Sequence, residues 1–179
     1  MPINDNILIR QEKPSEFKAI YELVKIAFQT AKVSSGDEQD FVDRLRASGN
    51  YIPELALVAE GKNSVLIGHV MLTNGSITCG DNSNHEILIL GPLAVAFENR
   101  NQGLGAKLVK IVLAKALDMG FTSVLLVGDP AYYERFGFKN LASAFGIKNT
   151  NGIPDQYVMA VELVSDALKN IKGSILFPH

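Results

Sequence analysis

The chain has 179 residues, 47% hydrophobic and 20% charged, and this length predicts one compact domain over residues 1–179. The net charge of −2 argues against nucleic acid or an anionic membrane surface as a partner. The longest apolar run, 87–97, is far shorter than the roughly 18 to 20 residues that cross a bilayer. Cys79 is the only cysteine, which excludes an internal disulfide and a Cys/His zinc cage.

The first half of the chain predicts a strand, two helices and a hairpin. A short apolar strand is expected at 7–10, and apolar residues at three-to-four spacing predict amphipathic helices over 15–28 and 37–46. Two apolar segments, 55–59 and 65–72, flank a polar turn and predict an antiparallel hairpin. The N-terminus lacks a basic segment followed by a long apolar stretch, so a cytoplasmic location is expected.

The second half begins with the most apolar strand candidate of the chain, 86–95, which is expected to be central. It contains Gly91-Pro92, and because proline cannot donate to a ladder, this pair predicts a bulge. A clear amphipathic helix follows at 104–119. Three shorter elements are expected after it: a buried parallel strand at 123–127, a short helix at 130–135 and a last strand at 156–163.

A glycine-rich segment, Arg100-Asn101-Gln102-Gly103-Leu104-Gly105, joins the central strand to that helix. The first N–H groups of a helix have no intrahelical partner, and glycines let a phosphate approach closely. The segment therefore predicts a phosphate or pyrophosphate site, with a simple chain reversal as the alternative. It lacks the third glycine of a dinucleotide-binding loop and the Gly-Lys-Ser/Thr ending of a P-loop.

At these residues the chain resembles the GNAT-type N-acetyltransferases. The segment 100–105 fits their coenzyme A signature, Q/R-x-x-G-x-G/A, and Tyr133-Glu134-Arg135-Phe136-Gly137-Phe138 fits their Y-E-x-x-G-F segment. The resemblance covers about residues 7–163, with most similarity to the YhbS-like bacterial subgroup. It implies a single GNAT domain of mixed α/β fold: a mostly antiparallel sheet with a bulged fourth strand and flanking helices.

The resemblance also implies acetyl-CoA as co-substrate, no metal, and acetyl transfer to a primary amine of a small molecule or peptide. Leu93 would donate its N–H to the developing oxyanion, and Val95 would pair with the pantetheine arm. Tyr133 would protonate the leaving thiolate, with a packing role as the alternative. The cofactor-binding set is Leu93, Val95, Arg100, Asn101, Gln102, Gly103, Leu104, Gly105, Ala106 and Tyr133, with Arg100 adding charge at the mouth.

The general base and the acceptor stay open at this point. Ile89 stands where many relatives have a glutamate, and the nearest candidates, His85 and Glu86, fit exposed strand-end residues better. His69 is interpreted as a structural histidine. The resemblance places the acceptor cleft at 28–46 and 141–156, and it allows a homodimer that no sequence feature requires. A second hypothesis is a non-catalytic acyl-CoA-binding sensor, which would not need Tyr133.

Overall fold

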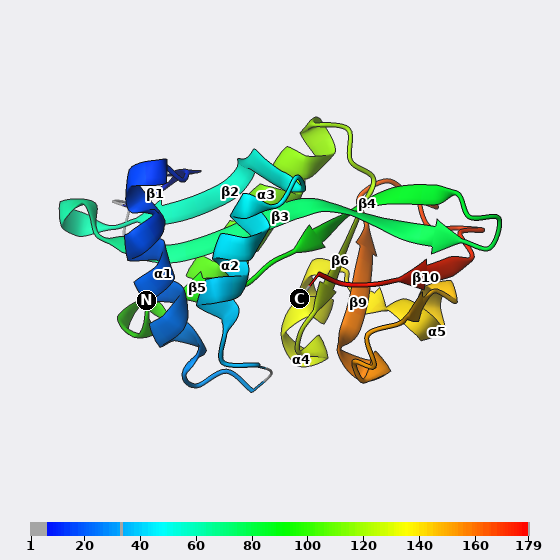
Figure 1. The fold of residues 1–179 in the computed structure, drawn as a ribbon. Coiled ribbons are helices and arrows are strands. Elements are labelled where there is room, and N and C mark those ends of the chain that lie inside the picture. The colour runs from blue at the N-terminus through cyan, green and yellow to red at the C-terminus, as the bar shows by residue number, and fades with distance from the viewer. Residues whose placement is uncertain (1–6, 33, 179) are drawn as a thin grey trace. The chain divides into compact units, whose positions relative to one another are not determined.

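The computed structural model describes residues 7–32 and 34–178, which form two compact units. The first unit contains the chain up to Thr73 together with Gly91–Lys115, and the second contains Asn74–Leu90 together with the chain from Ala116 onwards. Strand β3 (Leu66–Cys79) contributes its first part to one unit and its last part to the other (Figure 1). The expectation of a single domain over 1–179 stays a prediction.

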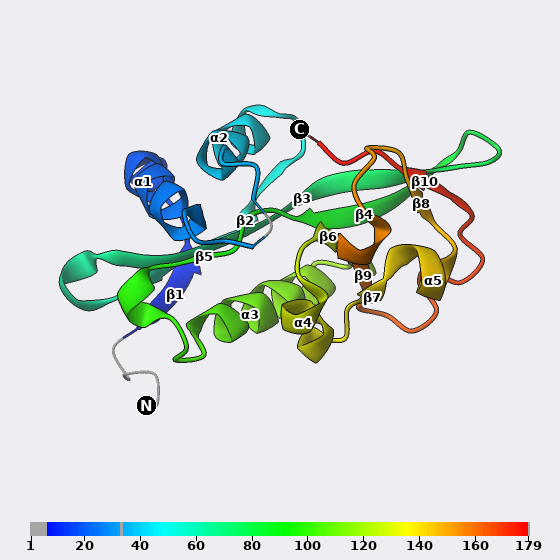
Figure 2. The ribbon, with the colours of Figure 1, turned by 90° about the horizontal axis from the view of Figure 1, so that it is seen from below.

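The first unit is a small sheet with helices on both faces. Figure 2 shows α1 and α2 on one face of β2 and β3 and α3 on the other. All its strand pairs are antiparallel: β1 with β2, β2 with β3, and β3 with β5. Its elements besides β3 are β1 (Leu8–Gln11), α1 (Phe17–Phe28), α2 (Glu38–Ala47), β2 (Tyr51–Glu60), β5 (Ala94–Val95) and most of α3 (Leu104–Asp118).

The core of this unit follows from the helical and strand periods. Residues of α1 and α2 at three-to-four spacing meet alternate residues of β2, β3 and β5. Those buried side chains are Ile20, Val24, Ala27, Val42, Leu45, Ala56, Val58, Met71 and Ala94. The two amphipathic helices and the hairpin expected from the sequence are thereby confirmed, although α1 is preceded by a separate 3-10 turn, Pro14–Glu16.

The second unit contains the remaining strands in a mixed arrangement. Strand β6 is parallel to β4 and antiparallel to β9, and β9 is antiparallel to β7. Strand β10 pairs with the end of β3 and with β8. The elements are β4 (Asn84–Leu90), β6 (Ser123–Val127), α4 (Pro130–Tyr133), β7 (Lys139–Asn140), α5 (Leu141–Phe145), β8 (Lys148–Asn149), β9 (Val158–Glu162) and β10 (Gly173–Ile175).

The C-terminal segment is where the sequence is least informative. It predicts no element after 163, yet β10 pairs there, and Ile175 and Phe177 are buried in the core of the second unit. Elements this short are defined by their pairing partners, because two or three residues carry no detectable period. None of the described helices is long and apolar enough to cross a membrane.

Candidate functional site

The strand expected at 86–95 is interrupted where Gly91-Pro92 predicts a bulge. Gly91 N–H donates to the Met71 carbonyl at 2.9 Å, and the next paired residue is Ala94, opposite His69. Between these points β3 advances by two residues and the other strand by three, so one residue is extra. The strand is thus divided into β4 and β5, which confirms the predicted bulge.

Packing explains the glycine at this position. A Cβ on Gly91 would lie 2.9 Å from Met71 Cγ and 3.3 Å from Leu45 Cδ1. A larger residue would therefore push the strand away from the core under α2.

The bulge frees main-chain groups on one edge of the first unit. Pro92 has no N–H, and the Leu93 N–H donates to no backbone carbonyl among the described residues. Within the described chain β5 pairs with β3 alone, so the other edge of Ala94–Val95 has no strand beside it. An extended ligand can add to such an edge by main-chain hydrogen bonds.

The loop that follows positions the start of α3. Asn101 and Gly103 adopt positive φ angles of 57° and 84°, which turn the chain sharply before the helix begins at Leu104. Lys107 N–H makes the first helical bond, to the Gly103 carbonyl at 3.0 Å. The N–H groups of Leu104, Gly105 and Ala106 precede that bond and have no helical acceptor. Together with the helix dipole they form a site suited to a phosphate.

Arg100 holds this loop against α1. Its Nε donates to the Val95 carbonyl at 3.1 Å, Nη1 donates to Thr30 Oγ1 at 2.9 Å, and Nη2 donates to the Ala27 carbonyl. The guanidinium also lies over the Phe97 ring, 4.1 Å from its centroid. These contacts use three of the five donors of Arg100 to join the loop, β5 and the end of α1. Its expected contribution of charge to a phosphate stays a prediction.

Tyr133 lies in the second unit, at the end of α4. Strand β6 leads into Asp129, whose Oδ1 caps α4 by accepting from Ala131 N–H at 3.0 Å. The Tyr133 ring packs directly on Gly128, since a Cβ there would lie 2.5 Å from Tyr133 Cε2. Its ring also meets Phe138 edge-on at 5.8 Å between centroids. The position of the ring is therefore fixed from two sides.

Unlike the ring of Tyr133, which packs on Gly128 and Phe138, its hydroxyl makes no contact within the described chain that holds it in place. No described residue hydrogen-bonds to it. Burial, with a smaller effect of neighbouring Tyr132, raises the pKa of Tyr133 well above its usual value of 10. The hydroxyl is accordingly a protonated donor at neutral pH.

A buried polar network in the first unit has members that the sequence does not reveal. Both Glu12 oxygens bind Arg46, with Oε1 to Nε at 2.8 Å and Oε2 to Nη2 at 2.9 Å. Glu12 also accepts from Tyr51 at 2.9 Å and lies 2.8 Å from His69 Nε2. The partners lie 34 to 57 residues from Glu12 in the sequence, so no short sequence motif predicts the network.

The pKa values show which charges this network contains. Burial alone would raise the pKa of Glu12, but the hydrogen bonds from Arg46 and His69 outweigh it and lower the pKa to about 2. Burial lowers the pKa of His69 despite the adjacent carboxylate. At neutral pH the network is an Arg46–Glu12 ion pair with a neutral histidine, which agrees with the structural interpretation of His69.

The base candidates of the central strand occupy ordinary strand positions. Ile89 is buried among apolar residues of the second unit, and Glu86 is exposed at the start of β4. His85 is half-buried, and its Nε2 has no hydrogen-bond partner among the described residues. Across the described part of the chain, no cluster of three or more His, Cys, Asp or Glu could hold a metal ion.

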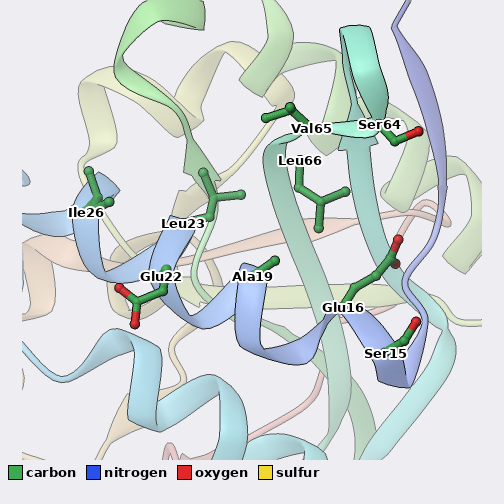
Figure 3. A pocket seen from close by; sticks show the side chains of 9 residues that line it. All are labelled: Ser15, Glu16, Ala19, Glu22, Leu23, Ile26, Ser64, Val65 and Leu66. Atoms are coloured by element: carbon green, nitrogen blue, oxygen red, sulfur yellow. The ribbon is translucent and has the colours of Figure 1, made fainter.

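One surface groove, of about 510 Å³, lies beside α1 and contains none of the expected site residues (Figure 3). It is lined by Ser15, Glu16, Ala19, Glu22, Leu23, Ile26, Ser64, Val65 and Leu66. The Glu16 carboxylate is already bound by Arg10, and the remaining lining is mostly apolar.

The comparisons with known proteins identify the family of the chain. The sequence profile of the acetyltransferase (GNAT) domain matches residues 8–141. The chain belongs to the GNAT acetyltransferase family. A curated family member, the uncharacterized N-acetyltransferase YhbS of Escherichia coli strain K12, is 30% identical over 169 residues, covering 94% of this chain and 95% of YhbS.

Two solved structures extend the likeness to GNAT proteins with bound ligands. The crystal structure of YhbS from Escherichia coli in complex with CoA has a TM-score of 0.85 and 28% identity, covering 99% of this chain and 93% of that one. A GNAT family acetyltransferase from Brucella melitensis in complex with acetyl-CoA has a TM-score of 0.77 and 26% identity, covering 98% and 97%. The expected family, mixed α/β fold and acyltransferase class are confirmed.

Proposed function

We propose that this GNAT acetyltransferase transfers the acetyl group of acetyl-CoA directly to a primary amine of a small molecule or peptide. The observation that carries this proposal is the succession of a bulged strand with an open edge and a helix start with unsatisfied N–H groups. The CoA and acetyl-CoA complexes of the two similar proteins support it.

The residues present fit such a ligand. The N–H groups of Gln102, Gly103, Gly105 and Ala106 would hold the pyrophosphate, and the positive φ of Gly103 turns the backbone toward it. The edge of β5 at Val95, beside which the described chain places no strand, would pair with the amides of the pantetheine arm, while the Val95 carbonyl also accepts from Arg100 Nε. No positively charged surface is required, because main-chain donors and the helix dipole supply the attraction.

Acetyl transfer then needs an uncharged amine and two hydrogen-bond donors, one for the carbonyl oxygen and one for the leaving sulfur. Bound acetyl-CoA supplies a thioester carbonyl for attack by an uncharged nitrogen, with a C–N bond formed and the C–S bond broken. The Leu93 N–H would donate to the oxygen on which negative charge develops. Tyr133 would give its hydroxyl proton to the departing sulfur. Burial raises the pKa of Tyr133, so its hydroxyl carries the proton at neutral pH and can donate it to the sulfur.

A non-catalytic sensor of acyl-CoA is the less favoured reading. A sensor needs the loop at the start of α3 to bind the coenzyme. It does not need a phenol whose ring is held in place and whose hydroxyl makes no hydrogen bond within the described chain. Membership in a family of acetyltransferases points the same way.

A thiol-release assay tests the proposal. Purified protein is incubated with acetyl-CoA and a panel of monoamines, polyamines, aminoglycosides, amino acids and peptides, and free CoA is measured with a thiol reagent. We expect amine-dependent release that falls about 100-fold or more in Tyr133→Phe, because a positioned general acid typically contributes about 100- to 10,000-fold. Tyr132→Phe removes a neighbouring hydroxyl and is the matched control. Equal rates in Tyr133→Phe and the wild type would remove the assigned acid.

A further inference from the structure

The first turn of α2 and the residue before it carry three carboxylates. In two of them, both oxygens accept hydrogen bonds from side chains of the protein. Asp37 accepts from the Ser35 hydroxyl with one oxygen and from Arg44 Nη2 with the other, at 2.9 Å. Asp40 accepts from Tyr21 at 2.9 Å and from a side-chain amide at 3.2 Å. Neither carboxylate needs a further partner.

Glu38 differs from both. Its side chain is buried, with 8% of the residue exposed, and Oε1 accepts from the Ser35 N–H at 2.8 Å. The second oxygen, Oε2, is buried and has no hydrogen-bond partner among the described residues. None of the ion pairs formed within the described chain involves Glu38 either. Burying an unpaired carboxylate oxygen is unfavourable, so this position requires a donor that the protein itself does not supply.

The helical period gives the direction of this carboxylate. Glu38, Val42 and Leu45 follow one another at i, i+4 and i+7, so they share the face of α2 that packs on the sheet. Leu45 on this face lies against Gly91, where the bulge begins.

Strand β3, which faces α2, carries a second buried polar atom without a hydrogen-bond partner among the described residues. Thr73 lies two residues after Met71 on the same face of β3, and its buried Oγ1 also lacks a hydrogen-bond partner among the described residues. Polar groups without partners therefore lie on both α2 and β3, on the surfaces that face each other across the core of the first unit.

On the basis of the acetyltransferase function proposed above, we propose that Glu38 binds a positively charged group of the acceptor. A buried carboxylate oxygen is complemented best by a cationic N–H donor. The attacking nitrogen must be uncharged, because its lone pair forms the new bond. The cation at Glu38 is consequently a second group of the same molecule, which identifies the acceptor class as diamines, polyamines and other amines with an additional cationic group.

The test compares two acceptors of equal length, 1,4-diaminobutane and butylamine, in the thiol-release assay. Only the diamine carries a second cation. We expect the wild type to prefer the diamine in kcat/KM, and Glu38→Gln to lower kcat/KM for the diamine 10- to 100-fold while changing that for butylamine less than threefold, the range of a charge-assisted hydrogen bond. Glu22→Gln, which removes an exposed carboxylate of α1, is the matched control.

Each outcome has a distinct meaning. A diamine preference that is equal in the wild type and Glu38→Gln, or lost equally in Glu22→Gln, overturns the role of Glu38 alone. Absence of thiol release by the wild type with every amine overturns the acetyltransferase proposal and the acceptor class with it. Thermal unfolding and acetyl-CoA titration verify that Glu38→Gln is folded. Should it not fold, Glu38→Asp keeps the charge on a shorter side chain, and an undiminished diamine preference in that variant counts against the proposal.

Discussion

Gly128→Ala should displace the phenol of Tyr133 without touching the phosphate loop. A Cβ at this position would lie 2.5 Å from Tyr133 Cε2 and 2.9 Å from Cδ2, whereas ordinary contacts begin at 3.4 Å. The backbone cannot easily yield, because Gly128 N–H is bonded to the Tyr157 carbonyl at 2.8 Å. The ring must therefore move by about 1 Å, and a misplacement of that size can cost on the order of 100-fold in rate.

The assay is kcat in thiol release with a saturating amine, measured beside calorimetric affinity for acetyl-CoA. We expect kcat to fall about 10- to 100-fold while the affinity stays within a factor of three, since the donors at the start of α3 are unchanged. Gly80→Ala is the control, because a Cβ at Gly80 meets nothing within 4 Å. Wild-type kcat in Gly128→Ala would refute the requirement for an accurately placed Tyr133 hydroxyl.

Two further predictions concern the first unit. The pKa of Glu12 is lowered from 4.5 to about 2, which corresponds to about 3 kcal/mol of stability that is present above pH 4.5 and lost as the pH falls toward 2. Glu12→Gln should lower the free energy of unfolding by about that amount at pH 7, and urea titrations should show the difference from the wild type shrinking below pH 4.5; a pH-independent difference would contradict the assignment. Arg100→Lys cannot reproduce bonds to Val95, Thr30 and Ala27 together, so we expect a lower melting temperature and several-fold weaker acetyl-CoA binding, and unchanged values of both would show that the guanidinium contacts are dispensable.

The sequence predicts those parts of the fold and site that have a local cause. Gly91-Pro92 within an apolar run predicts the bulge, because proline cannot donate and the strand cannot stay paired. The glycine-rich junction predicts the turn into α3. The period of α2 also places Glu38 in line with Val42 and Leu45, although charged side chains are usually exposed.

What the sequence does not predict depends on distant partners. Arg100 looks like a phosphate ligand in the motif, and only the folded chain shows its guanidinium bonded to α1, 70 or more residues away. The Glu12 network joins the residue after β1 to α2, β2 and β3, and it forms only when these elements are packed. Short strands such as β8 and β10 exist because each supplies the other with a pairing partner.

Calorimetric titration of acetyl-CoA into the wild type and into Gly105→Trp tests the central claim most directly. An indole at the start of α3 would fill the space where the N–H groups of the loop are expected to meet the pyrophosphate. We predict one-site binding to the wild type and at least a 100-fold loss of affinity in Gly105→Trp, with both proteins showing the same folded circular dichroism spectrum. Equal affinity in the two proteins, or no binding to the wild type, would contradict the assignment of this loop as the coenzyme site.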